Sequence, residues 1–230
     1  MHIPDGFLSA PVYAAGYAVS GAVCAVAIVR ANRRLGEREV PLLGMTAAFV
    51  FAAQMLNFPV AGGTSGHFLG ATLAAVLLGP LNACLVMATV LLIQCLGFAD
   101  GGLTALGANL FNMGIVGAIG GWLLFRALKA ILPKSRWGFL AAAAAASWTA
   151  VVAASAICAV ELAWSGTSPL QVALPAMAGV HALIGVGEAL ITTAVLSTVL
   201  AVRPDLVSAW ERNGDCGLRS ADCGMKEARS

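Results

Sequence analysis

Long uninterrupted apolar runs dominate the sequence, and short polar or glycine-rich segments separate them. The first run extends from about Ser9 to Ala31, and the second extends from about Pro41 to Phe58. A membrane-spanning helix needs about 20 mostly apolar residues, whereas a transmembrane β-barrel would show roughly ten-residue strands of alternating polarity. Because the runs are unbroken and rich in Ala, Leu and Val, they predict membrane helices.

The rest of the chain continues this pattern with one internal break. The stretch from His67 to Leu96 is too long for one crossing, and Gly79-Pro80 near its middle predicts a tight turn between two shorter helices. Further spans are predicted at residues 103–128, 138–162 and 173–202. The total is seven transmembrane helices, which form an all-α polytopic bundle over residues 1–204 with a polar tail over residues 205–230.

The composition supports a membrane protein and excludes a soluble globular one. Of the 230 residues, 60% are apolar and only 10% are charged, against roughly 25% charged in an ordinary soluble domain. The Gly-Lys-Ser/Thr triplet of a phosphate-binding loop does not occur, so ATP-driven transport would need another subunit to hydrolyse the nucleotide. The cysteines are scattered and indicate reduced thiols rather than a disulfide framework. They are Cys24, Cys84, Cys95, Cys158, Cys216 and Cys223.

The positions of the basic residues predict how the chain is oriented. All 13 Lys and Arg fall within residues 30–38, residues 126–136 or the tail from residue 203 onward. Basic loops remain in the cytoplasm, so these three clusters mark the inner face. The prediction is an extracytoplasmic N-terminus, a cytoplasmic C-terminus and a multi-pass protein of the bacterial inner (plasma) membrane.

Two of the three histidines, His2 and His67, are predicted to lie on the outer side. The terminal amine of Met1, the main-chain nitrogen of His2 and its Nδ1 can close two fused chelate rings around one metal ion, and His67 can fill a fourth position. Four nitrogens in a plane suit Ni(II) or Cu(II) and are tolerable for Co(II), whereas Ca(II) and Mg(II) prefer oxygen. Pro4 and Gly6 favour a turn that directs residues 1 and 2 inward. The alternative is a solvated terminal histidine without a function.

Four motifs carry a resemblance to a known family. They are MHIPDGFL at the start, NFPVAGGTSGHFLG at residues 57–70, GFADGGLTALGANLFNMG at residues 97–114 and HALIGVGEALIT at residues 181–192. Over residues 1–205 the chain resembles the substrate-binding membrane subunit of cobalt and nickel energy-coupling-factor transporters, the CbiM/NikM family. The resemblance implies one divalent ion bound by Met1, His2 and His67, and a fold of six helices plus an N-terminal one.

The resemblance also implies a biological role. The chain would be the substrate-binding subunit of an ABC-type importer that captures Co²⁺ for cobalamin synthesis, with Ni²⁺ as the alternative cargo. Its expected partners are a membrane coupling subunit, two cytoplasmic ATPase subunits and, in cobalt systems, a small further membrane subunit. No catalytic activity, catalytic cofactor or nucleic-acid partner is expected.

Other polar residues have two interpretations each. Thr64 and Ser65 either orient His67 or cap the following helix. His181 and Glu188 lie two helical turns apart on the last span, where they either have a function or form a buried pair that stabilises the bundle. Three side-chain amides are candidates for holding the N-terminal segment by hydrogen bonds. They are Gln94, Asn109 and Asn112.

A protease is the more remote alternative. Residues 63–66 read Gly-Thr-Ser-Gly, so a rhomboid-like intramembrane serine protease would use Ser65 as its nucleophile and His181 as its base. In such proteases the serine belongs to a later helix, whereas Ser65 follows the second span. This interpretation also leaves the N-terminal motif unexplained.

Overall fold

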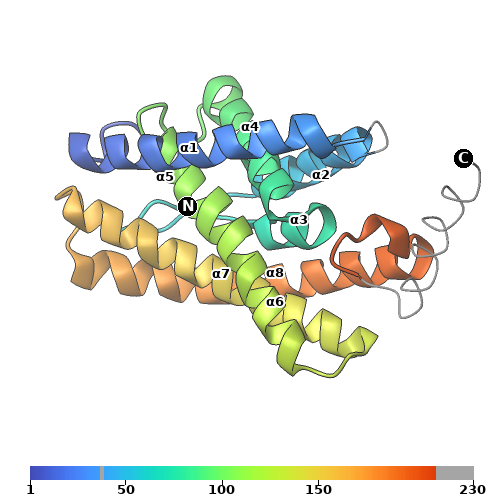
Figure 1. The fold of residues 1–230 in the computed structure, drawn as a ribbon. Helices are drawn as coiled ribbons and strands as arrows, with labels where there is room; N and C mark the ends of the chain where they lie inside the picture. Colours follow the sequence, from blue (N-terminus) through green and yellow to red (C-terminus); the bar gives the residue numbers. More distant parts are fainter. Residues whose placement is uncertain (37–38, 211–230) are drawn as a thin grey trace, which may run out of the picture.

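The computed structural model describes residues 1–36 and 39–210, which form a bundle of helices joined by short loops (Figure 1). Helix α1 (Ala10–Arg34) is followed by α2 (Glu39–Gln54). The break predicted at Gly79-Pro80 is confirmed, because α3 (Ala71–Leu78) ends at Gly79 and α4 (Pro80–Phe98) starts at Pro80. Gly79 has a φ of +85°, a conformation that favours glycine, and proline suits the first turn of a helix.

The second half contains one long composite helix and a helical hairpin. The composite helix consists of α5 (Leu106–Leu110), a π-helical segment (Phe111–Gly120) and α6 (Gly121–Ile131). Helices α7 (Arg136–Trp164) and α8 (Leu170–Val202) form the hairpin and pack extensively on each other. The loop predicted after the second span also contains a two-stranded antiparallel pair, β1 (Phe58–Pro59) and β2 (Ser65–Gly66).

Five helical stretches of the described chain are long and apolar enough to cross a bilayer. They are α1, α4, the composite helix, α7 and α8. Helix α2 has 16 residues and α3 has eight, and eight residues rise only about 12 Å, far less than the roughly 30 Å hydrocarbon core. The chain is therefore a helical multi-pass membrane protein, while the count of seven crossings stays a prediction.

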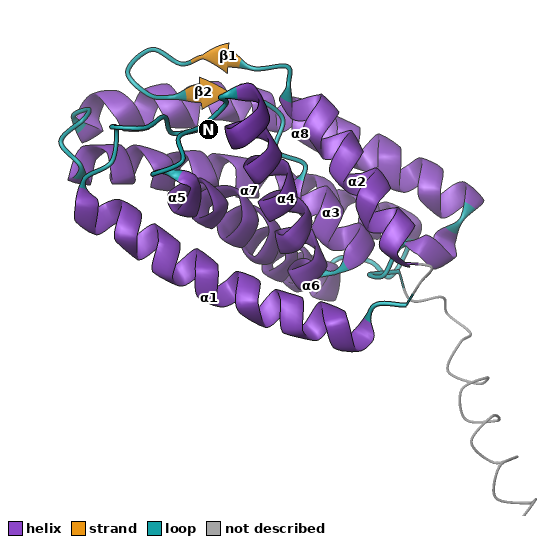
Figure 2. Ribbon diagram, turned by 90° about the horizontal axis from the view of Figure 1, so that it is seen from above, coloured by secondary structure: helices purple, strands orange, loops and turns teal. Residues whose placement is uncertain are grey.

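The connecting loops gather at one end of the bundle together with the N-terminus. The loop near residue 57 reaches the loop near residue 100 through the hydrogen bonds of Asn57 with Asp100, and Ser168 donates to the carbonyl oxygen of Gly62. Figure 2 shows the β1–β2 pair directly beside the N-terminus. Figure 1 shows the N-terminus between α1 and the α7–α8 hairpin. The chain start is thus enclosed by several elements.

The basic residues of the described chain lie toward the opposite end. Arg30 lies beside the turn between α3 and α4, and Arg136 at the start of α7 donates to the carbonyl oxygen and hydroxyl of Ser197 near the end of α8. The predicted basic residues Arg38, Arg212, Arg219, Lys226 and Arg229, together with Cys216 and Cys223, lie outside the described residues. The charge asymmetry on which the predicted orientation depends is therefore present in the fold.

Residues after α8 continue the packed bundle further than the sequence predicts. A short 3₁₀ turn (Pro204–Leu206) follows α8, and the amides of Ser208 and Ala209 then donate to the carbonyl oxygens of Leu77 and Val76 at the end of α3. The carbonyl oxygens of Val76 and Leu77 lie in the last turn of α3 and have no partner within that helix, so the amides of residues 208 and 209 supply their hydrogen bonds. The bundle thus extends to residue 210, past the boundary predicted after residue 204.

Candidate metal centre

The first three residues of the chain run into the bundle and are buried. Met1 is 0% exposed and His2 is 3% exposed. Asn109 of α5 holds Ile3 from both sides, since its Oδ1 accepts the Ile3 N–H at 2.8 Å and its Nδ2 donates to the Ile3 carbonyl at 3.2 Å. The amide of Gly102 donates to the same carbonyl at 2.8 Å. The inward direction of residues 1 and 2 is confirmed, and Asn109 has the role predicted for it.

The turn that follows is fixed to two other loops. Oδ1 of Asp5 accepts the hydroxyl of Thr104 at 2.6 Å and its amide at 2.7 Å, and these bonds lower the pKa of Asp5. The hydroxyl of Thr167 donates to the carbonyl oxygen of Phe7. Gly6 provides the positive φ of +81° that the turn requires. The turn expected from Pro4 and Gly6 is therefore present.

The terminal amine is buried against Ser65. It donates to the carbonyl oxygen of Ser65 at 2.6 Å and to its Oγ at 2.9 Å, and the amide of His2 donates to the same Oγ at 3.0 Å. Burial lowers the pKa of the amine from 8.0 to about 5, because a charged group is penalised where water is excluded. At neutral pH the amine therefore has two N–H groups, both used by Ser65, and one free lone pair.

The rings of His2 and His67 lie next to each other, with centroids 4.5 Å apart and planes tilted by 42°. Nδ1 of His67 is 2.7 Å from the carbonyl oxygen of Phe68, so this nitrogen carries the proton. Its Nε2 is buried and makes no hydrogen bond with any described residue. Burial, with the nearby amine and His2, holds the pKa of His67 well below 6.5. His67 therefore presents a neutral Nε2 with a free lone pair.

The His2 ring contacts a carboxylate from the loop that follows α4. Nδ1 of His2 lies 2.7 Å from Oδ1 of Asp100, which also accepts hydrogen bonds from Asn57. Burial lowers the pKa of His2, although Asp100 opposes this shift. Burial alone would raise the pKa of Asp100, but its contacts with His2 and Asn57 outweigh that effect and the pKa is lowered. A chelate through Nδ1 therefore requires the His2 ring to leave Asp100.

The loop that carries His67 is held by two helices. Glu188 of α8 accepts the amide of Leu69 on Oε2 at 2.7 Å and the amide of Gly70 on Oε1 at 2.8 Å. Nε2 of Gln54 on α2 donates to the Leu69 carbonyl at 2.7 Å. Gly70 has a φ of +74°, and a Cβ there would lie 2.8 Å from the Phe68 ring. Helix α8 thus fixes the loop two residues beyond His67.

Several predictions for the neighbouring polar residues are corrected. Thr64 and Ser65 do not cap the next helix, because α3 begins only at Ala71 after Gly70. Thr64 instead contacts the sulfur atoms of Cys158 and Met177, at 3.8 and 3.9 Å. Strand β2 and the loop at residues 67–70 separate Thr64 from the helix start.

The other predicted amides and the predicted side chains of α8 make contacts that differ from those expected from the sequence. Asn112 donates to Glu161 at 2.6 Å rather than to the N-terminal segment, and the Gln94 side chain makes no hydrogen bond within the described residues. Glu188 bonds to the His67 loop rather than to His181, whose Nδ1 lies 2.7 Å from the Met177 carbonyl. Asn112 thus bonds to α7 and Glu188 bonds to the loop before α3, and sequence spacing alone does not reveal such contacts between elements.

A serine protease dyad is not formed in the described chain. Oγ of Ser65 accepts hydrogen bonds from the terminal amine of Met1 and from the amide of His2. No hydrogen bond joins this Oγ to His181. A nucleophilic serine requires a base within hydrogen-bonding reach.

Three or more His, Cys, Asp and Glu side chains do not gather into a metal site anywhere in the described residues. A site here therefore depends on main-chain nitrogen as well as imidazole.

A cavity of about 430 Å³ lies beside the candidate metal centre. His2, Ser65 and Asp100 line it, and so do exposed residues such as Asp5 and Leu96. The cavity therefore connects the surface with the side chains around the terminal amine. Its two carboxylates, Asp5 and Asp100, favour the entry of a cation.

Comparisons with known proteins identify a family of metal transport proteins. The family described as "Cobalt uptake substrate-specific transmembrane region" matches residues 2–206. A putative fused nickel transport protein of Archaeoglobus fulgidus is 44% identical over 220 residues, which cover 95% of this chain and 72% of that protein. A cobalt transport protein of Pelobacter propionicus is 36% identical and covers 87% of this chain and 91% of its own length.

A solved structure extends the similarity to the fold. The crystal structure of a truncated transition metal transporter has a TM-score of 0.81 and 35% sequence identity, and the match covers 87% of this chain and 99% of that one. The family match over residues 2–206 includes His2 and the His67 loop. The chain belongs to the CbiM family of cobalt and nickel transport proteins of the membrane.

Proposed function

We propose that this protein captures a divalent transition-metal ion, Co²⁺ or Ni²⁺, through Met1, His2 and His67. The observation that carries the proposal is the buried terminal amine beside two neutral imidazoles, with the Nε2 of His67 free of partners in the described chain. Neutral nitrogen donors suit late first-row transition metals. The amine and the Nε2 of His67 have free lone pairs at neutral pH, whereas the main-chain nitrogen of His2 releases its proton when it binds the metal.

Capture proceeds by exchange of partners. A hydrated ion enters the cavity beside Asp100, loses water and meets the lone pair of the terminal amine. The His2 ring turns from Asp100 and its ring proton shifts from Nδ1 to Nε2 through water, while the main-chain N–H of His2 releases its proton to water. The Nδ1 and the main-chain nitrogen of His2 then close the fused rings with the amine. Ser65 Oγ, which holds both main-chain nitrogens at 2.9 and 3.0 Å, is displaced. Nε2 of His67 completes the plane.

The transport cycle requires partners in this proposal. The chain is the substrate-binding subunit of an energy-coupling-factor importer of the ABC type, located in the bacterial inner membrane with its N-terminus outside. The complete transporter also contains a membrane coupling subunit, two cytoplasmic ATPases and, in a cobalt system, a small further membrane subunit. The location of all described basic residues toward one end of the bundle supports this orientation. Toppling of the loaded subunit then releases the ion inward.

The test is a one-alanine insertion between Met1 and His2. The insertion keeps every side chain but adds up to about 3.6 Å of chain. Because Asn109 fixes Ile3, the inserted residue must displace Met1 or His2 from its position. Metal binding measured by calorimetry should be lost. The matched control inserts one alanine after Gly36, which is exposed at the other end of the bundle. Metal binding that survives the first insertion would overturn the proposed ligand set.

Cobalt and nickel are separated by a competition measurement. Both ions fit the same nitrogen donors, and the relatives include a cobalt and a nickel transport protein. Cobalt is the first candidate, with cobalamin synthesis as the use of the ion. The purified protein is equilibrated with equal concentrations of the two ions and its metal content is measured. An excess of bound nickel would favour the nickel alternative.

A further inference from the structure

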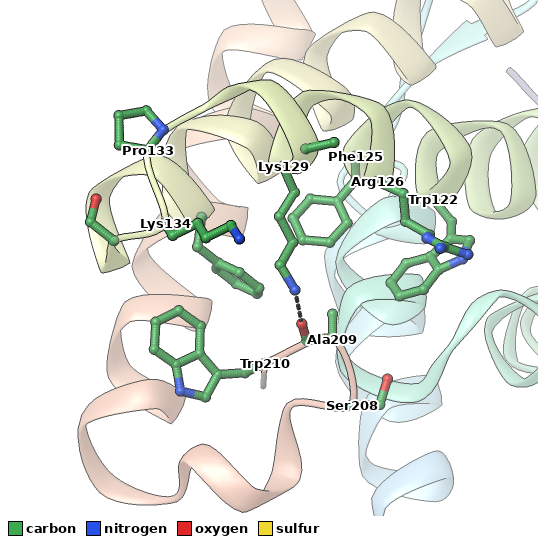
Figure 3. A pocket seen from close by; sticks show the side chains of 12 residues that line it. Trp122, Phe125, Arg126, Lys129, Pro133, Lys134, Ser208, Ala209 and Trp210 are labelled. Carbon is green, nitrogen blue, oxygen red and sulfur yellow. Dashed lines mark hydrogen bonds between the residues drawn. The ribbon is translucent and has the colours of Figure 1, made fainter. Parts of the chain in front are cut away.

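A second cavity, of about 510 Å³, lies at the end of the bundle opposite the candidate metal centre. It is formed by α6, the link between α6 and α7, Phe139 in the first turn of α7, and residues 208–210 after α8. Figure 3 shows Lys129 in the middle of this pocket, Arg126 with Trp122 on one side, and Lys134 near Trp210 on the other. Two stretches far apart in sequence, residues 122–139 and 208–210, therefore build one site.

The pocket carries three positive charges and no negative one among its lining residues. Lys129 is already held, because its Nζ donates to the carbonyl oxygen of Ala209 at 2.8 Å and lies 5.8 Å from the centre of the Phe139 ring. Arg126 and Lys134 are exposed and make no hydrogen bond or ion pair with other residues of the described chain. Two cationic side chains thus remain available to an anion.

A chain of aromatic rings forms the wall of the pocket. Trp122 stacks on Phe125 at 5.6 Å, Phe125 meets Phe139 edge-on at 5.1 Å, and Phe139 meets Trp210 edge-on at 5.0 Å. Because these rings pack against each other, they hold residues 208–210 against α6. The pocket is therefore a packed part of the bundle.

The surroundings place the pocket at the level of a bilayer surface. Ile131 and Trp137, which flank the link between α6 and α7, are each 80% exposed. An exposed aliphatic side chain at the end of an apolar helix suits acyl chains, and tryptophan is enriched where acyl chains meet headgroups. An anion in this pocket would have acyl chains within reach on the same side. This favours a lipid over a soluble anion.

We propose that this pocket binds the phosphate headgroup of an anionic phospholipid, with Arg126 and Lys134 as the charged contacts and Trp122 and Trp210 beside the glycerol region. Basic pockets between membrane helices recognise lipid headgroups in this way. The phosphate lies between the two free cations. The lipid thereby bridges α6 and the link to α7, next to the segment that follows α8.

The experiment titrates the purified full chain with phosphatidylglycerol or phosphatidylcholine and measures binding by native mass spectrometry. The pocket variant is Arg126→Gln with Lys134→Gln. Its matched control is Arg30→Gln with Arg33→Gln, which removes two exposed charges at the same end outside this pocket. Phosphatidylglycerol affinity should fall about thirtyfold in the pocket variant, from the attraction of basic residues to anionic lipid. In the control variant the phosphatidylglycerol affinity should change by less than about threefold, which is on the order of experimental scatter.

Each other outcome overturns the proposal. An equal loss in both variants would assign the preference to the whole basic face. Displacement of phosphatidylglycerol by inorganic phosphate, with phosphate affinity lost in the pocket variant, would identify a site for a soluble anion. Unchanged lipid affinity with lost binding of the coupling subunit would identify a protein contact. Thermal unfolding in phosphatidylcholine, which should be the same for all variants, separates these outcomes from misfolding.

Discussion

Replacing Glu188 with Gln tests whether α8 positions the metal site. The carboxylate is buried in the bundle, yet both of its oxygens accept backbone N–H groups from the loop that follows His67, at 2.7 and 2.8 Å. An ionised carboxylate only accepts hydrogen bonds, so it matches two N–H donors. Gln has nearly the same size but replaces one acceptor by an NH₂ group. One of the two loop amides then faces a donor.

The magnitude follows from the number of bonds affected. A buried N–H without a partner costs roughly 1–3 kcal/mol, and the remaining bond loses its charge assistance. The loop must therefore shift to find other partners, and such a shift moves Nε2 of His67. Hydrogen-bond partners that orient metal ligands typically change metal affinity by about 10–100-fold. We expect a loss of metal affinity in this range together with a lower melting temperature.

The assay is calorimetric titration of Co²⁺ and Ni²⁺ into the purified variant, with unfolding followed by thermal scans. The control is Glu161→Gln, a buried carboxylate on α7 that bonds to the side chain of Asn112 rather than to the loop. It should lower stability with a smaller effect on metal affinity. A Glu188→Gln protein that melts earlier but binds both ions with unchanged affinity would refute the positioning role.

Three further predictions use the same site. The metal-free protein should become more stable as the pH rises from 5 to 8, because the Met1 amine has a pKa of about 5 when folded and 8.0 when unfolded, so the unfolded chain binds more protons in that window; thermal scans across this range check it. Asn109→Ala should destabilise the fold by roughly 1–3 kcal/mol by leaving the buried Ile3 amide without its partner, and should weaken metal binding in the same titrations. Ser65→Ala should weaken metal uptake without abolishing it, since Ser65 Oγ holds the ligand nitrogens but is replaced on capture; uptake of radioactive cobalt measures this.

The helices could be predicted from sequence because the membrane imposes a simple pattern. Apolar runs of sufficient length and the Gly79-Pro80 break gave the positions of the main helices to within a few residues. The shortness of α3 was not predictable, because residues 67–70 remain a loop although the apolar run already includes Phe68 and Leu69. The π-helical segment at Phe111–Gly120 has no sequence signal that the hydrophobic pattern could reveal.

The candidate ligands could be predicted because their chemistry is local to the chain start. Met1 and His2 are adjacent, and His67 is one of only two other histidines. Asn109 was one of three amides expected to hold the N-terminal segment. The roles of Asp100 and Glu188 could not be predicted, because each lies about 100 or more residues from its partner. Such contacts depend on how helices pack, which spacing along one element does not determine.

Burial explains why the site needs this many supporting contacts. Removing the amine and two imidazoles from water keeps them neutral and ready for a dication, but it also costs the energy of desolvating their polar atoms. Asn109 from α5, Gln54 from α2 and Glu188 from α8 offset this cost by fixing the backbone on either side of the ligands. Because the two halves of the site are held by different helices, the distance between His2 and His67 depends on how those helices pack. A movement of α8 against α5 would therefore separate the ligands, and the same contacts that organise capture would then weaken the hold on the ion.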